Sequence, residues 1–378
     1  MFDDAYPDYH DTPDEHDMLA LVDSMNGGHL TTNALGQDIA MPSDHEWLMD
    51  LIEVDRQLRA MAQAAQLLDS ERLIQPDAFG SEVMTLASHP LLDTLITVYT
   101  VLVTLFQETE IGHHYRPSPY ATRFLRAFAN CPYLHEAGFH HPPTMSREVA
   151  EQTVMELNQR LGVWYQSLKQ PDFTYECGRN RRNSQKNYKR LRFLMDSLIA
   201  CYASLEVVRV DLSYSELDSP FITYEAARHH REQLCRHFHQ NPGVFNHLVG
   251  YTWKLEWQPK KGFHYHWLFF FDGHQVREGI TRARWIGDLW AQAITGGQGI
   301  YRNVNRNAEN VYRYNATGTL RYHDTDKLKG LDLLAHYLTK GDEYAAMVVQ
   351  GRTFQTSKAP DLPEGPRLGR PRQYAPVY

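Results

Sequence analysis

The chain has 378 residues, of which 42% are hydrophobic and 22% are charged, and this balance excludes a fibrous or wholly disordered protein. Its net charge of −8 is unevenly distributed: residues 1–55 hold fourteen Asp or Glu and no Lys or Arg, whereas the remainder carries 38 basic against 32 acidic side chains. The overall acidity therefore does not exclude a nucleic-acid partner for the body of the chain.

Membrane, secreted and zinc-ribbon classes are not favoured either. The longest apolar run, 94–106, is too short to span a bilayer, and no basic segment followed by an apolar stretch opens the chain. The cysteines form no C-x-x-C pair, so we expect reduced thiols. These observations predict a soluble cytoplasmic protein without a membrane partner. The four cysteines are Cys131, Cys177, Cys201 and Cys235.

The first half of the chain is predicted to be a leader followed by helices. Residues 1–42 are rich in Asp, Gly, Asn and Pro, which predicts an acidic, largely disordered leader. Ser43 and Glu46 fit a capping box, and apolar residues then recur at helical spacing. Further helices are predicted over about 91–107, over about 119–130 and after Ser146. We therefore expect 43–175 to form an all-α domain, to which the sequence assigns no chemistry.

A run of basic residues follows this domain and holds no acid, so it has no charge of opposite sign with which to pair internally. One interpretation is a solvated helix face, and the other is contact with a phosphate backbone. The candidate DNA-binding residues are Arg179, Arg181, Arg182, Lys186, Lys189, Arg190 and Arg192.

After Leu205 the hydrophobic period changes to two. Strands are predicted over 206–214, 248–257 and 263–271, with helices over about 223–240, 278–294 and 326–340. The order β-α-β-β-α-β-α over 176–350 predicts an α+β fold, an antiparallel sheet with helices on one face. The tail 351–378 holds five prolines and five Lys or Arg, and we expect it to be extended and mobile.

The hairpin 248–271 carries the candidate metal ligands. His264 and His266 are two residues apart and therefore share a strand face. If Trp257 pairs with Phe263, Glu256 lies directly opposite His264, where cross-strand Cβ atoms are ~5 Å apart. One carboxylate and two imidazoles form a ligand set for a divalent metal with open positions. The alternative is a pair of structural histidines.

The last predicted helix supplies a candidate nucleophile. Tyr337 and Lys340 are neighbours at i and i+3, opposite a stripe of leucines. A phenol of pKa ~10 is a weak nucleophile, but a metal-bound phosphate and a nearby ammonium make its attack on phosphorus feasible. The alternative is a surface tyrosine on an amphipathic helix.

Three segments resemble the motifs of the HUH endonucleases, the rolling-circle replication initiators: V-R-V-D-L-S-Y at 208–214, F-H-Y-H-W at 263–267 and H-Y-L-T-K at 336–340. More narrowly, 178–372 resembles the inovirus gene-two-protein-like family, also called the YagK/YfjJ C-terminal domain. The resemblance implies an antiparallel sheet of the order already predicted, in a phage or prophage enzyme that nicks and rejoins single-stranded origin DNA.

The resemblance also implies roles for individual residues. Glu256, His264 and His266 would hold Mg²⁺ or Mn²⁺, Tyr337 would form a 5′-phosphotyrosine and leave a 3′-OH, and Lys340 would steady the phosphate. Arg209 and Asp211 match the first motif, and the resemblance assigns them only strand packing or DNA contact. A host helicase or polymerase would be a further partner.

The sequence departs from two-tyrosine members of the superfamily. Those members place the second tyrosine four residues after the first, where this chain has Gly341. Tyr344 would share the face of Tyr337 only if the helix continued through Gly341, so a one-tyrosine enzyme is expected. An HUH transposase or relaxase with the same chemistry and a non-catalytic prophage DNA-binding regulator are the open alternatives.

Overall fold

The computed structural model describes residues 29–41, 46–77, 83–240 and 243–362. These residues form two compact units. The first holds 29–41, 185–240, 243–340 and 349–362, and the second holds 46–77, 83–184 and 341–348. The α+β class is confirmed. The predictions for 1–28, for the Ser43–Glu46 cap and for 363–378 fall outside the described side chains.

The second unit is mainly helical. Its helices begin where the sequence offers caps: Ser118 accepts a hydrogen bond from the Ala121 N–H, and Ser146 accepts one from the Val149 N–H. The all-α prediction is wrong in one respect, because two short two-stranded sheets, β3–β4 and β5–β11, lie among the helices. The elements are α2 (Glu46–Ala64), α3 (Ser70–Leu73), β3 (Ile74–Pro76), β4 (Met84–Leu86), α4 (Pro90–Gln107), α5 (Ile111–His114), β5 (Tyr115–Pro117), α6 (Pro119–Ala127), α7 (Pro132–Phe139), α8 (Arg147–Ser167) and β11 (Ala345–Met347).

Helix α4 is the one helix in the described chain that is long and apolar enough to cross a membrane by length and composition. It packs against α2 and α7, and Leu92, Leu95 and Leu102 on its length are almost fully buried. A core helix of this kind passes the same length and composition test. Its apolar residues form the core of the helical unit.

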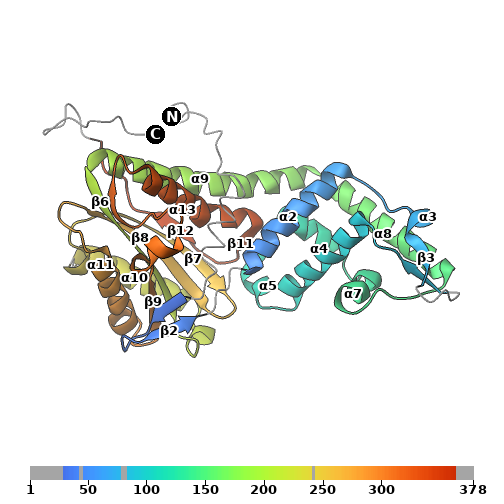
Figure 1. The fold of residues 1–378 in the computed structure, drawn as a ribbon, viewed down its shortest axis with the longest axis horizontal. Helices are drawn as coiled ribbons and strands as arrows, with labels where there is room; N and C mark the ends of the chain where they lie inside the picture. The colour runs from blue at the N-terminus through green and yellow to red at the C-terminus, as the bar shows by residue number, and fades with distance from the viewer. Residues whose placement is uncertain (1–28, 42–45, 78–82, 241–242, 363–378) are drawn as a thin grey trace. The chain divides into compact units, whose positions relative to one another are not determined.

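The first unit is built on a sheet that has eight strands among the described residues and is seen with its covering helices in Figure 1. Its order is β12-β7-β8-β6-β9-β1-β2, with β10 also paired to β6. All the pairs are antiparallel, as predicted. The strands are β1 (His29–Thr32), β2 (Asp38–Met41), β6 (Ser204–Tyr214), β7 (Leu248–Gln258), β8 (Gly262–Asp272), β9 (Gly299–Asn303), β10 (Gly318–Arg321) and β12 (Phe354–Thr356).

Helices cover both faces of this sheet, so the expectation of one covered face is wrong. On one face, Phe238 of α10 (Tyr224–Gln240) lies edge-on against Trp267 and Phe269, and α11 (Gly279–Asp288) packs on β6. On the other face, Tyr337 of α13 (Thr325–Tyr344) contacts His266. The C-terminal part of α9 (Pro171–Cys201) also lies on that face, since Leu198 borders Gly250. This explains why β8 is almost continuously apolar, as a central strand buried on both faces requires.

Three segments differ from the sequence predictions. Residues 29–41, assigned to a disordered leader, form the β1–β2 hairpin at the sheet edge. Residues 354–356, assigned to the mobile tail, pair with β7. The predicted helix 278–294 divides into α11 and a π-helical turn, Leu289–Ile294. In each case pairing or packing with segments distant in the sequence decides the conformation, and local composition does not report it.

Candidate metal centre and its surroundings

The candidate ligands meet on the central strands of the sheet. The predicted register of the hairpin is confirmed: Trp257 pairs with Phe263, and Glu256 lies directly opposite His264. The neighbouring strand β6 places Asp211 opposite His266. Side chains from β6, β7 and β8 therefore lie together on the sheet face that α13 covers.

Glu256, His264 and His266 form a compact group whose ligand atoms all lie within 4.8 Å of one another. The Nε2 atom of His266 is 3.1 Å from Oε2 of Glu256, and the Nε2 atom of His264 is 3.7 Å from the same oxygen. Both histidines are buried. The two nitrogens and the carboxylate oxygen are close enough together for one cation to bind all three.

His264 is oriented by the turn that precedes it. Gly262 has a φ of +60°, a conformation that favours glycine, and its carbonyl accepts a hydrogen bond of 3.1 Å from Nδ1–H of His264. Because Nδ1 carries the proton, Nε2 of the neutral ring keeps its lone pair. Burial lowers the pKa of His264 and favours this neutral form. Within the described residues its buried Nε2 has no hydrogen-bond partner, and a cation would satisfy it.

His266 is held from the opposite side of its ring. Its Nδ1–H donates to Oδ1 of Asp211 over 2.8 Å. Burial opposes protonation of His266, but the carboxylates of Asp211 and Glu256 outweigh it and raise the pKa to about 9. A carboxylate behind a metal-ligating histidine fixes the ring orientation and the tautomer. The sequence did not identify Asp211 in this role, because the β6–β8 pairing joins residues 55 positions apart.

The buried Arg209 and the half-buried Arg302 in turn hold the Asp211 carboxylate in place. Nε of Arg209 is 3.5 Å from Oδ1 of Asp211, and Nη1 of Arg302 is 4.0 Å from Oδ2. Burial alone would raise the pKa of Asp211, yet Arg209 and His266 hold it well below its usual value. Burial likewise opposes ionisation of Glu256, and His266 and His264 keep its pKa well below its usual value. Both carboxylates are therefore ionised at neutral pH, and the donor set of the three candidate ligands fits a divalent metal ion.

Tyr337 lies against this group rather than on the surface. Its ring centroid is 5.9 Å from that of His266 at 73°, and the side chain is only 4% exposed. Burial, followed by the negative charge of Glu256, raises its pKa well above the usual value, while Arg209 acts in the opposite direction. The phenol is therefore protonated at neutral pH, and added positive charge beside it would favour its ionisation.

The other expected residues of the last helix are placed differently. Lys340 is half-buried one turn after Tyr337 and lies close enough to His336 to contribute to lowering its pKa. Within the described chain, no hydrogen bond or ion pair joins Lys340 to Glu256, His264 or His266. The sequence predicted that this helix ends at Lys340, but it continues through Gly341 to Tyr344. Tyr337 and Tyr344, seven residues apart, therefore share a helix face.

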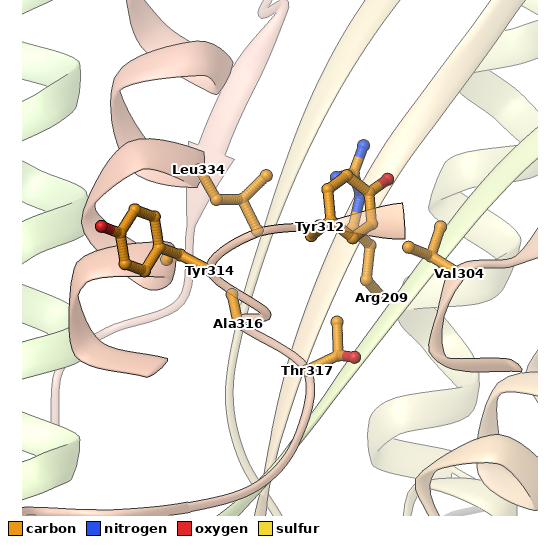
Figure 2. A pocket seen from close by; sticks show the side chains of 8 residues that line it. Arg209, Val304, Tyr312, Tyr314, Ala316, Thr317 and Leu334 are labelled. Atoms are coloured by element: carbon orange, nitrogen blue, oxygen red, sulfur yellow. The ribbon is translucent and has the colours of Figure 1, made fainter. Parts of the chain in front are cut away.

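Arg209 is not on a DNA-accessible surface, contrary to the expectation from the first motif. It is only 3% exposed, because β6 is a central strand. Figure 2 shows its guanidinium beside the ring of Tyr312, in a small pocket of otherwise mainly apolar lining. Its charge instead acts inward, on Asp211 and Tyr337. The remaining lining residues are Val304, Tyr314, Ala316, Thr317, Gly330 and Leu334.

The predicted basic run lies on α9, a continuous helix of 31 residues. Six of its seven cations are exposed, and no ion pair links any of the six to an acid in the described chain. Arg192 differs, because it is half-buried and pairs with Asp196 and Asp332 at 3.0 and 3.3 Å. The six exposed cations are Arg179, Arg181, Arg182, Lys186, Lys189 and Arg190.

Comparison with known proteins identifies a family match over part of the chain. No curated protein and no solved structure is significantly similar to the chain. The matched range contains Asp211 and the three candidate metal ligands and ends before Tyr337. Residues 174–314 match the family model of the YagK/YfjJ C-terminal domain, and this match overlaps most of its length with the range 178–372 over which the sequence suggested that family.

Proposed function

We propose that this protein is a metal-dependent DNA nickase and strand-rejoining enzyme, a phage or prophage initiator of rolling-circle replication. The observation that carries the proposal is the buried Glu256–His264–His266 group with the Tyr337 ring 5.9 Å from His266. A buried tyrosine beside a cation-binding group is suited to attack on a phosphodiester, because a bound cation would offset the burial and the Glu256 charge that raise its pKa. The YagK/YfjJ match over 174–314 supports a phage or prophage context.

In the proposed reaction each residue has a separate task. Glu256 and the Nε2 atoms of His264 and His266 would hold Mg²⁺ or Mn²⁺, which supplies Lewis-acid polarisation of the phosphate and positive charge. Asp211 keeps the Nδ1 proton of His266 in place and thereby orients the ring. The positive charge of Arg209 favours ionisation of Tyr337.

The chemistry is a transesterification. The Tyr337 oxygen forms a bond to phosphorus while the bond from phosphorus to the 3′-oxygen breaks. The proton that the phenol loses is balanced by the proton that the released 3′-oxygen gains. The product is a 5′-phosphotyrosine and a free 3′-OH, from which a polymerase can extend. Attack by a 3′-OH on the phosphotyrosine reverses these steps and rejoins the strand.

The test is adduct formation on denaturing gels. The full chain is incubated with Mn²⁺ and single-stranded DNA tiled across the replicon that encodes it. We expect a covalent adduct with wild type, none with Tyr337→Phe, and an unchanged yield with the matched control Tyr314→Phe. Absence of an adduct from the wild-type chain on every tile would overturn the enzymatic proposal in favour of a DNA-binding regulator. An adduct that persists in Tyr337→Phe would reassign the nucleophile, first to Tyr344.

The role of the histidines has its own test. His264→Ala is expected to abolish metal-dependent cleavage and to leave the affinity for DNA without metal unchanged. Equal loss of cleavage and of DNA affinity would assign His264 a structural role instead.

A further inference from the structure

One face of α9 carries most of its exposed cations. At 3.6 residues per turn, five of the six fall within an arc of about 100° around the helix axis. Arg181 is the exception and points about 130° away from the centre of this arc. We name this face the α9 stripe; its members are Tyr175, Arg179, Arg182, Lys186, Lys189, Arg190 and Phe193.

The cations of the α9 stripe are not neutralised by acids of the described chain. All five are exposed, and none forms an ion pair with an acid in the described chain. On the same helix, Arg192 lies outside the arc and is neutralised by Asp196 and Asp332. The helix therefore carries one cation that is paired with acids and a row of uncompensated positive charge on another face, which is favourable only with an anionic partner or abundant counterions.

Two exposed aromatic residues complete the stripe. Tyr175 is 63% exposed and Phe193 is 44% exposed, and both fall at the same angle around the helix, inside the arc of the cations. The Arg182 guanidinium lies 6.0 Å from the Tyr175 ring centroid, which agrees with a common face. Cations that follow a backbone and aromatic rings that stack on bases are the two elements of single-stranded nucleic-acid binding sites.

We infer that the α9 stripe binds single-stranded DNA without sequence preference, as a surface separate from the Glu256–His264–His266 group. From Tyr175 to Phe193 the helix rises about 27 Å at 1.5 Å per residue, enough for several nucleotides. The inference rests on the proposed function for its choice of DNA. It adds that the enzyme holds the strand by charge and stacking at a place where no chemistry occurs.

The test measures binding in the absence of metal, so it does not depend on cleavage. The probe is a fluorescein-labelled dT20 oligonucleotide, titrated with the full chain in EDTA at 50 to 200 mM salt. Five phosphate contacts predict a slope of log K against log salt of about −3.5, and hence an affinity loss of about 100-fold over this range. Replacing the five cations by Gln should abolish most of this dependence, whereas a slope equal to that of wild type would overturn the inference.

Single substitutions on the same helix provide the matched control. Arg182→Gln and Arg190→Gln should each reduce the slope by about 0.7, and Arg181→Gln, exposed but outside the arc, should leave it unchanged. An equal effect of Arg181→Gln would show that only net charge matters and would overturn a defined binding face. All variants change exposed side chains, and equal melting temperatures would verify their folding.

The aromatic residues decide the class of partner. Tyr175→Ala and Phe193→Ala should each weaken dT20 binding at least fivefold, which is the lower bound for loss of one stacked base. Unchanged affinity in both, or tighter binding of a 20-base-pair duplex or of anionic phospholipid vesicles, would overturn the single-strand assignment. A chain that forms the Tyr337 adduct but lacks stripe-dependent binding refutes this inference alone; the converse result refutes the nickase alone.

Discussion

Replacing Asp211 by Asn separates two tasks of one carboxylate. Asp211 accepts the Nδ1–H of His266 over 2.8 Å and compensates the charge of Arg209, which is only 3% exposed. Loss of the negative charge leaves a buried cation without its closest counter-charge, at a cost of about 3 kcal/mol of unfolding free energy. It also removes the anchor of the His266 tautomer, which should weaken metal binding by about 10- to 100-fold.

A second substitution distinguishes these effects. In Arg209→Met/Asp211→Asn the unpaired buried cation is removed together with its partner, so most of the unfolding free energy should return. The affinity for Mn²⁺ should stay low, since His266 still lacks its carboxylate. As a control, Asp332→Asn removes a carboxylate that pairs with Arg192 and has no contact with the three candidate ligands. It should not change metal affinity.

Urea unfolding and titration calorimetry with Mn²⁺ measure the two quantities independently. Wild-type Mn²⁺ affinity in Asp211→Asn would refute the proposed orientation of His266. Recovery of metal affinity in the double variant would show that Asp211 matters only as the counter-charge of Arg209. Both outcomes are readable without a DNA substrate.

Three further predictions concern pH, packing and the acidic leader. Burial lowers the pKa of His336 to about 4, below its value in the unfolded chain, so the unfolded state takes up the proton first on acidification. Lowering the pH from 7 to 5.5 should therefore remove about 1 kcal/mol of unfolding free energy. Urea unfolding should show a smaller loss for His336→Gln, and equal losses would contradict this assignment. A Cβ on Gly287 would meet the Tyr301 ring at 2.1 Å, so Gly287→Ala should lower the unfolding free energy by about 2 kcal/mol. The control Gly162→Ala adds a Cβ where there is free space and should not lower it. Equal urea unfolding midpoints for the two variants would refute the packing argument. Residues 1–28 hold eight Asp or Glu and no Lys or Arg. Their removal spares the β1–β2 hairpin and should tighten dT20 binding at low salt. An unchanged affinity would exclude competition between these acidic residues and DNA for the basic surface.

The hairpin and its ligands were predictable because they are local. Alternation of apolar and polar residues indicated the faces of β7 and of the segment 263–267 in β8, and a short turn set their register, so the Glu256–His264 pair followed from the sequence. Asp211 and Arg209 did not follow, since their strand joins the site through a non-local pairing. Tyr337 was predicted on an exposed flank, but α13 is covered on almost every side, a property that a single leucine stripe does not reveal.

The N-terminal hairpin has a consequence for synthesis of the chain. Thr32 of β1 pairs with Tyr301 of β9, and Asp38 at the start of β2 forms an ion pair of 2.7 Å with Arg306. These partners are separated by about 270 residues, which a ribosome adds in roughly 15 to 55 s at about 5–20 residues per second. For that interval the hairpin has no edge to join. Among the described strands, β1 and β2 are therefore synthesised first but can pair with β9 only after Tyr301 has been added.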